Sequence, residues 1–282
     1  MIRAYVINLD RSPERMLQMR DMLQQLDLPF QRISAVDGNA LSPELIDEVT
    51  RLAPGQKSPT AGQVGCFLSH RLAWEQIAGG QDDYGLVLED DVIFASNFKR
   101  VVTDHQLYKA GADIIRLEGW PERAWISANG RKVCDGYRAH RLSWDTYGTC
   151  GYLISRRCAR KLVEAARLYT APIDHMMFTT RGDVFKMADI EALVPAACFQ
   201  HLFYHGRADG PMASTITLAI TPAIKRAKGN FPTRVAREFA RLADKLARLL
   251  RGERRKAVLL HPTGPLALAG DGKAEDAGRL LQ

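Results

Sequence analysis

The sequence predicts an α/β fold in which a mostly parallel central sheet is flanked by helices and followed by a basic helical tail. Short apolar runs without polar alternation, such as residues 85–88, are typical of strands buried on both faces of a helix-covered sheet. Segments with helical spacing lie between such runs, starting with a strand, a turn and a helix in residues 4–26. The chain has 282 residues, 46% hydrophobic and 25% charged, which suits one large domain with an appendage.

Composition and cysteine content bear on the compartment. No apolar run approaches the roughly 20 residues of a membrane span, and the first residues turn polar too early for a signal peptide. We therefore expect a cytoplasmic protein. An odd number of cysteines without a C-x-x-C pair favours reduced thiols over disulfides or a zinc site. We expect all five to be small core residues, namely Cys66, Cys134, Cys150, Cys158 and Cys198.

The N-terminal segment predicts a strand over residues 4–9 and a helix that runs to about Leu26. Ser12 can serve as the N-cap, and Pro13 suits the first helical position, where a missing N–H has little effect. Arg11 and Arg15 lie near the helix start, where free N–H groups favour anions, so a nucleotide or phosphate could bind there. The alternative is that both arginines are surface residues.

The next segments place more polar residues near strand and helix ends. A strand over residues 30–38 ends in an Asp37–Gly38 turn, where Asp37 could bind a ribose hydroxyl or simply shape the turn. Residues 39–60 hold three prolines and predict an irregular surface insertion. Residues 62–77 predict a helix with Ser69 and His70 on its less apolar side, where His70 has either a functional or a structural role.

Three acids follow the apolar run at residues 85–88: Glu89, Asp90 and Asp91. Adjacent carboxylates repel one another, and at the rim of a core they lose hydration unless a cation or hydrogen-bond donors replace it. Oxygen ligands at a strand end suit Mg²⁺ or Mn²⁺, which would in turn hold phosphate oxygens. The alternative is a solvated acidic turn.

Four blocks in a fixed order, residues 6–15, 35–38, 65–70 and 87–92, resemble the signature of glycosyltransferase family 25, the lipooligosaccharide-type β-galactosyltransferases. The likeness extends to about Gln200. It implies a GT-A-like nucleotide-sugar-binding fold, a UDP-sugar donor, and Mn²⁺ or Mg²⁺ on the donor diphosphate. The resemblance implies that the donor-binding residues are Asn8, Leu9, Arg11, Arg15, Asp37, Gly38, Ser69, His70, Glu89 and Asp90.

The resemblance also implies roles in metal binding and catalysis. The acidic motif has Glu89 where Asp-x-Asp motifs begin with Asp, so Glu89 contacts either metal or ribose. The expected metal ligands are Asp91 and Glu89, with His201 or His205 completing the set. An inverting transfer needs a base for the acceptor hydroxyl, and the resemblance implies Asp174, with His175 as second choice.

Asp174 could instead act as a helix N-cap. Aromatic residues suit sugar faces or a core, and five of them are of interest here: Trp120, Trp125, Tyr137, Trp144 and Tyr147.

We divide the chain into a catalytic domain, residues 1–205, and a tail, residues 206–282. Residues 223–256 carry twelve basic and three acidic residues, a net charge of +9, while the whole chain carries +7. Within the tail, residues 233–256 predict a basic amphipathic helix that either binds an anionic membrane surface or packs on the domain. From about His261 onward, the high content of Gly, Pro, Ala and Asp predicts a disordered end. No motif indicates nucleic-acid binding.

Two functions remain open. The first is a metal-dependent hexosyltransferase, with galactose the first candidate, that moves a sugar from a UDP-sugar to lipooligosaccharide, lipopolysaccharide or another surface glycan at the inner face of the cytoplasmic membrane. The second is a catalytically inactive sugar- or nucleotide-binding module on the same fold. A phosphatase or nuclease is disfavoured, because neither Asp90 nor Asp91 starts a D-x-D-x-T pattern.

Overall fold

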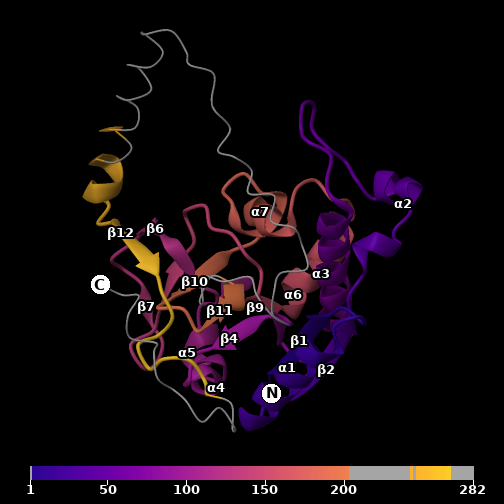
Figure 1. Ribbon diagram of the computed structural model, residues 1–282. Helices are drawn as coiled ribbons and strands as arrows, with labels where there is room; N and C mark the ends of the chain where they lie inside the picture. Colours follow the sequence, from indigo (N-terminus) through magenta and orange to yellow (C-terminus); the bar gives the residue numbers. More distant parts are fainter. Residues whose placement is uncertain (1, 203–241, 244–245, 268–282) are drawn as a thin grey trace.

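The computed structural model describes residues 2–202, 242–243 and 246–267, and the centre of this part is an eight-stranded sheet (Figure 1). The strand pairings make six of the eight strands run in one direction, with β9 and β8 reversed. The predicted α/β fold with a mostly parallel sheet is confirmed. In spatial order the strands are β2 (Phe30–Ser34), β1 (Arg3–Asn8), β3 (Tyr84–Glu89), β9 (Gly151–Ser155), β5 (Ile114–Arg116), β10 (Ile190–Val194), β8 (Arg138–Arg141) and β7 (Arg131–Lys132).

Helices cover both faces of the sheet, as the apolar strand runs predict. Side chains alternate along each strand, so in β3 Val87 packs in one buried cluster while Leu86 and Leu88 pack in the other. The Val87 face is covered by α3 (Ala61–Gly79), α6 (Arg156–Ala165), α7 (Ile173–Phe178) and α8 (Asp183–Met187). The opposite face is covered by α1 (Pro13–Gln25), α4 (Phe98–Val102) and α5 (His105–Tyr108).

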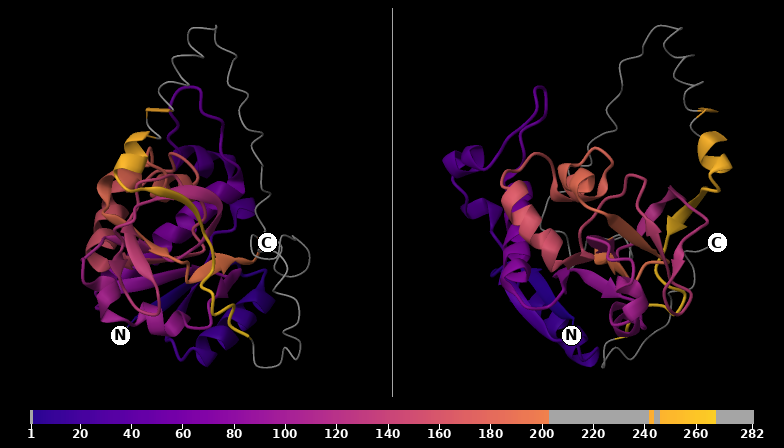
Figure 2. Two further views of the ribbon diagram at one scale, coloured as in Figure 1. Left: turned by 90° about the vertical axis from the view of Figure 1, so that its left-hand side faces the viewer. Right: turned by 180° about the vertical axis from the view of Figure 1, so that it is seen from behind.

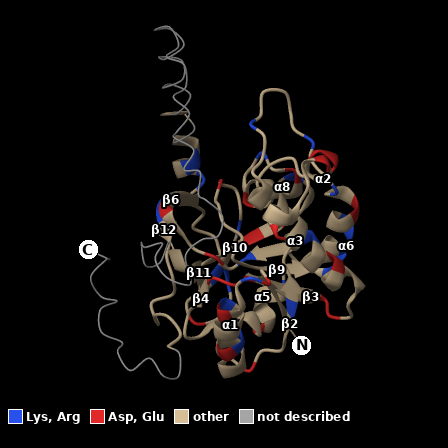
Figure 3. Cartoon of the chain, turned by 45° about the vertical axis from the view of Figure 1, so that its right-hand side comes forward, with Lys and Arg blue, Asp and Glu red and all other residues tan. Residues whose placement is uncertain are grey.

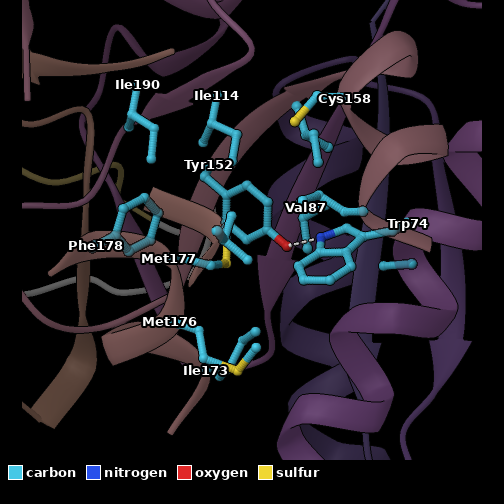
Figure 4. Close-up of a cluster of buried hydrophobic side chains, with 14 of the residues drawn as sticks. Trp74, Val87, Ile114, Tyr152, Cys158, Ile173, Met176, Met177, Phe178 and Ile190 are labelled. Carbon is cyan, nitrogen blue, oxygen red and sulfur yellow. Dashed lines mark hydrogen bonds between the residues drawn. The ribbon is translucent and has the colours of Figure 1, made fainter. Parts of the chain in front are cut away.

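The core on the Val87 face also contains a satisfied polar group. Figure 4 shows Tyr152 of β9 pointing toward Trp74 of α3, and the Trp74 indole N–H donates to the Tyr152 hydroxyl at 2.8 Å. Both side chains are fully buried, so an unpaired N–H here would be strongly unfavourable. The hydrogen bond therefore fixes how α3 lies against the reversed strand β9.

Helix starts follow the sequence signals with one exception. The helix predicted over residues 62–77 is α3, and it begins with a reciprocal capping box between Thr60 and Gln63. Helix α1 begins at Pro13 as predicted, and Ser12 is its N-cap residue. The Ser12 side chain, however, makes no capping hydrogen bond, because its backbone is not in the usual capping conformation.

The insertion predicted over residues 39–60 is more ordered than expected. It contains most of a 3₁₀ turn, η1 (Gly38–Ala40), and a short helix, α2 (Pro43–Glu48), whose N-cap Ser42 accepts from the Leu45 N–H. Figure 2 shows α2 and the loop that follows it projecting from the body of the protein. The loop after α2 forms one wall of a cavity described below.

The tail differs from the prediction where it is described. The predicted boundary at residues 205/206 lies outside the described residues and stays a prediction, as do residues 233–241 and 244–245 of the predicted helix. The described helical residues end at Leu250, and β12 (Arg254–Val258) pairs antiparallel with β6 (Trp120–Ile126). Pairing with an edge strand holds the end of the predicted helix as a strand instead (Figures 1 and 2).

The residues after β12 also depart from the expected disordered end. The His261 N–H donates to the Ala196 carbonyl at 3.0 Å, and the Leu266 N–H donates to the Phe94 carbonyl at 2.7 Å. Phe94 belongs to β4 (Val92–Phe94), which pairs with β11 (Cys198–Gln200). Backbone hydrogen bonds therefore attach residues 261–266 to the domain. Residues beyond 267 lie outside the described part.

Within the described residues, no helix has both the length and the apolar character needed to cross a bilayer. The five cysteines are free, and Cys150, Cys158 and Cys198 are buried as expected. Cys66 and Cys134 are partly exposed, and each packs against one of the two core clusters, so these two lie at the edge of the core.

Helix α3 and the turn at η1 touch through glycines. A Cβ atom on Gly65 would lie 2.6 Å from the Val36 carbonyl oxygen and 2.9 Å from the Gly38 nitrogen, while one on Gly79 of the same helix would meet nothing within 4 Å. We expect Gly65→Ala to lower the free energy of unfolding by about 1–3 kcal/mol, because backbone must move aside. Gly79→Ala, the matched control, should be neutral or stabilise by up to about 1 kcal/mol through helix propensity.

Urea unfolding of the two variants checks this expectation. Equal stability of Gly65→Ala and Gly79→Ala would contradict the tight approach of α3 to η1.

Candidate active site

A pocket, here called the strand-end pocket, opens where β1, β2 and β3 end. Eight of the ten residues predicted to bind a donor line it, which places the separate sequence blocks around one space. This grouping follows from parallel pairing, since β1 pairs with both β2 and β3 and their carboxyl ends meet at one edge. The lining residues are Ile7, Leu9, Arg11, Ala35, Val36, Asp37, Gly38, Asn39, Gly62, Cys66, Ser69, His70, Glu89 and Asp90.

Asn8 and Arg15, the other two predicted donor-binding residues, do not line the pocket. Both hydrogen-bond to Asp90, with Asn8 Nδ2 2.7 Å from Oδ2 and Arg15 NH1 3.0 Å from Oδ1. Arg15 is 3% exposed and Asn8 1%. The described contacts of Asn8 and Arg15 therefore anchor the acidic turn to β1 and α1.

The rim of the pocket holds Arg11 and Asp37. Arg11 Nε lies 3.0 Å from Asp37 Oδ2, and the other Asp37 oxygen accepts from the Asn39 N–H. Both side chains are partly exposed, so a ligand can reach them. Asp37 thus shapes its turn, as the plainer interpretation predicted, and is also open to the pocket.

Ser69 lies deeper and has a structural task. Its hydroxyl donates to the Gly65 carbonyl at 2.6 Å and accepts from the Val36 N–H at 2.9 Å. It therefore ties α3 to the loop after β2.

His70 and Glu89 face each other across the floor of the pocket. His70 Nε2 lies 3.4 Å from Glu89 Oε1, and its Nδ1 lies 3.0 Å from the Tyr152 hydroxyl. The Tyr152 oxygen already accepts from Trp74, so its own O–H can donate to Nδ1, which leaves the ring hydrogen on Nε2 facing Glu89. Burial raises the pKa of Glu89, but His70, Thr149 and Arg15 outweigh burial, and the net pKa is lowered.

Asp91 is a buried carboxylate whose surroundings suit a bound cation. Burial, with the charges of Glu89 and Asp90, raises the pKa of Asp91 to about 7. Its Oδ2 accepts from Gln200 Nε2 at 2.9 Å, while the buried Oδ1 has no hydrogen-bond partner among the described residues. A divalent ion would satisfy that oxygen and lower the pKa, so Asp91 fits the predicted metal role.

The rest of the predicted metal set is less tightly grouped. The His201 N–H donates to the Asp91 carbonyl at 2.8 Å, so the two residues are neighbours through the backbone. Among the described residues, the one group of three potential ligand atoms within 4.8 Å of one another is Cys66, His70 and Glu89. The possible ligand atoms of the predicted set, Glu89, Asp91 and His201, do not all lie within that distance of one another, and the metal role of this set stays a prediction. Figure 3 shows acidic residues, in red, in the interior near β9, β11 and β4.

Asp174 lies on the other side of the segment 147–150. It is in the first turn of α7, where the N-cap is Pro172, so the alternative that Asp174 caps the helix is wrong. Its Oδ1 accepts from the His175 N–H at 2.9 Å and its Oδ2 from the Gly148 N–H at 3.3 Å. The next residue, Thr149, donates from its hydroxyl to Glu89 Oε1 at 2.6 Å. Consecutive residues therefore hold Asp174 and Glu89.

Two buried residues that carry no local sequence signal, Arg116 and Glu118, support this segment. Arg116 donates to the Tyr147 carbonyl, and Glu118 Oε2 accepts from the Cys150 N–H at 3.0 Å. The two side chains also pair with each other at 3.4 Å. Burial raises the pKa of Glu118 to about 8, although Arg116 opposes the shift. Neither residue stands in a motif, and only the fold brings them to the segment.

A larger cavity, here called the α7 cavity, lies next to Asp174. Its volume is about 730 Å³, and the loop after α2 forms one wall. Among the aromatic residues of interest, Tyr147 lines it and contacts both Trp120 and His175 with tilted rings, whereas Tyr137 and Trp144 are buried. The lining residues are Arg51, Leu52, Ala53, Gln56, Asp145, Tyr147, Thr170, Ala171, His175, Met176, Thr179, Arg181, Gly182 and Asp183.

The structure defines an α/β protein with a pocket at the carboxyl ends of parallel strands, and comparison with known proteins gives its family. Residues 1–177 match the family model described as glycosyltransferase family 25 (LPS biosynthesis protein). The chain belongs to glycosyltransferase family 25. Its helix-flanked, mostly parallel sheet agrees with the GT-A-like fold that the resemblance implies.

Relatives in the family include active and inactive members by name. The chain is 36% identical over 186 residues to a glycosyltransferase 25 family member of Aedes aegypti, covering 60% of this chain and 29% of that one. It is 34% identical to procollagen galactosyltransferase 1-B of Xenopus laevis (62% and 30% covered). It is 30% identical to inactive glycosyltransferase 25 family member 3 of Mus musculus (62% and 31% covered). The chain therefore spans about a third of the length of these relatives.

The raised pKa of Glu118 predicts how the free energy of unfolding depends on pH. The folded protein holds a proton on Glu118 up to about pH 8, whereas the unfolded chain releases this proton near the ordinary glutamate pKa of 4.5. Stability therefore falls as pH rises between these values, by up to about 1.4 kcal/mol per pH unit. We expect Glu118→Gln to gain stability relative to the natural chain as pH rises from 5 to 8.

Urea unfolding at pH 5, 6.5 and 8 measures the difference, and Glu164→Gln on the exposed side of α6 controls for the loss of a carboxylate. A constant difference, or one that grows toward low pH, would contradict the assignment.

Proposed function

We propose that this chain transfers a hexose, with galactose the first candidate, from a UDP-sugar to a hydroxyl of lipooligosaccharide, lipopolysaccharide or another surface glycan, with inversion and with a divalent metal. The family description names LPS biosynthesis, and the Xenopus relative is named a galactosyltransferase. The observation that carries the proposal is the link through residues 148 and 149, which holds Asp174 and Glu89 on two sides of one turn. A base and a donor site must be this close for a direct displacement.

The strand-end pocket takes the donor in this proposal. Asp37 offers carboxylate oxygens for ribose hydroxyls, Glu89 contacts either ribose or the metal, and Arg11 offers a cation for the diphosphate. Asp91 and Glu89, with His201, would hold Mn²⁺ or Mg²⁺. When bound, the ion neutralises charge on the departing diphosphate.

Asp174 takes the proton of the acceptor hydroxyl. Its two oxygens already accept from backbone N–H groups, so the carboxylate is held in one orientation toward the segment 147–150. The α7 cavity beside it offers Tyr147 and His175, whose ring faces suit the apolar side of a sugar. His175 is exposed and remains the second candidate for the base.

The alternative function is a catalytically inactive sugar- or nucleotide-binding module. The mouse relative is named inactive, so a member of the family without transferase activity has precedent. Against it, the chain retains Asp91 in an unsatisfied buried environment, which is unfavourable for a group without a task.

We also propose that the tail places the enzyme at the inner face of the cytoplasmic membrane. In the described part of the tail, four leucines are exposed, namely Leu242, Leu246, Leu249 and Leu250. Basic residues surround them in the sequence, with a net charge of +9 over residues 223–256. An exposed apolar stripe with many basic neighbours suits an anionic lipid surface better than water.

Two substitutions separate donor binding from chemistry. We expect Asp91→Ala to abolish metal-dependent binding of the UDP-sugar. The substitution removes the carboxylate whose Oδ1 has no hydrogen-bond partner among the described residues and would bind the ion. We expect Asp174→Asn to leave donor binding unchanged and to lower kcat by about 10²–10⁴-fold, the usual contribution of a general base. Calorimetry with UDP-galactose with and without Mn²⁺, and a transfer assay on the same preparations, measure both effects.

Glu164→Gln, an exposed carboxylate on α6, should change neither measurement. Loss of donor binding in Asp174→Asn would overturn the base assignment. Binding of UDP-galactose without any transfer by the natural chain to lipooligosaccharide acceptors would favour the inactive module.

A further inference from the structure

We infer that Cys66, His70 and Glu89 form a binding site for a thiophilic divalent ion of the Zn²⁺ type, inside the strand-end pocket and next to the Asp91 site, with which it shares Glu89. The three ligand atoms lie within 4.8 Å of one another. A thiolate, an imidazole and a carboxylate are the ligand types that Zn²⁺ takes, whereas Mg²⁺ and Mn²⁺ favour oxygen-rich sites without a thiolate.

The distances suit a tetrahedral ion. Two ligands at the usual zinc bond lengths of about 2.0–2.1 Å lie about 3.3 Å apart in a tetrahedron. His70 Nε2 and Glu89 Oε1 are 3.4 Å apart. Cys66 and His70 are four residues apart on α3, so their side chains project on the same side of the helix. The thiol therefore needs to approach by roughly 1 Å at most, which a small rotation about its Cα–Cβ bond supplies.

Neighbouring residues hold the imidazole in place. His70 is fully buried, and its Nδ1 meets the Tyr152 hydroxyl, which Trp74 holds in turn. Zinc-binding histidines are oriented in this way, by a hydrogen bond on the ring nitrogen that does not bind the ion. Binding moves the ring hydrogen from Nε2 to Nδ1, where the Tyr152 oxygen can accept it. The Cys66 thiol gives up its proton to solvent.

The ion would keep an open position toward the pocket. All three residues line the strand-end pocket, and Cys66 and Glu89 are partly exposed there, so the fourth ligand is water or an oxygen of a bound molecule. Because Glu89 takes part in both sites, occupancy by Zn²⁺ removes a residue that the donor or its own metal needs. This consequence rests on the proposed function, whereas the ion site itself does not.

Co²⁺ is the probe for the site, because thiolate coordination gives a near-ultraviolet charge-transfer band and tetrahedral geometry gives intense visible bands. We expect both with the natural chain, and we expect Zn²⁺ to displace Co²⁺. Cys66→Ser should remove the charge-transfer band and weaken Zn²⁺ binding in calorimetry by at least tenfold. Cys134→Ser, which removes the other partly exposed thiol, should leave both unchanged.

His70→Gln gives a second test should Cys66→Ser alter folding, and it should lower the intensity of the visible bands while circular dichroism stays native. An unchanged charge-transfer band in Cys66→Ser, or its loss in Cys134→Ser, would overturn the site.

Competition between Zn²⁺ and the sugar donor is measured in a separate experiment. Zn²⁺ should weaken UDP-galactose binding in the natural chain and not in Cys66→Ser. If no UDP-sugar binds while the Co²⁺ bands appear, the proposed function fails and the ion site stands.

Discussion

Asp90 is the constraint on which the site depends. Its carboxylate accepts from Asn8 of β1 and from Arg15 of α1, residues 82 and 75 positions away in the chain. All three side chains are buried, and removal of one partner from such a buried pair costs about 3–5 kcal/mol, because the other charge stays unpaired. The acidic turn therefore cannot move without the N-terminal strand and helix. The contacts of Asp90 therefore also fix the positions of its two neighbours, Glu89 and Asp91.

The three adjacent acids consequently have different environments. Glu89 faces His70 and Thr149, and its pKa is lowered despite burial. Asp91 lies on the side of β4 and β11, where burial and the other two charges raise its pKa to about 7. Neighbouring carboxylates with opposite pKa shifts are a mark of functional sites, since a purely structural turn gains nothing from them. One acid anchors the turn, one contacts the pocket, and one has an oxygen that a cation could satisfy.

Sequence reasoning found the parts of the site that have local signals. Strand ends and the Asp37–Gly38 turn are encoded within a few positions, and eight of the ten predicted donor-binding residues gather around one pocket. Residues that act through long-range contacts carry no such signal. Arg116 and Glu118 contact the segment 147–150 only because β5 and β9 pair. Cys66 did have a signal, its spacing of four from His70, but cysteines were interpreted as core residues. The end of the tail was misjudged because pairing with β6 outweighs helical periodicity.

The reversed strand β9 explains why the site forms at this edge. In a sheet of parallel strands, only carboxyl ends reach the edge where Glu89 stands. Because β9 is antiparallel to β3, with Leu88 opposite Gly151, it is the beginning of β9 that lies there. The residues just before it, Gly148 and Thr149, then contact Asp174 and Glu89. A parallel strand in this position would put them at the opposite edge. The reversal thus brings α7 and the acidic turn to one place, and the Trp74–Tyr152 hydrogen bond fixes β9 against the helix that carries His70.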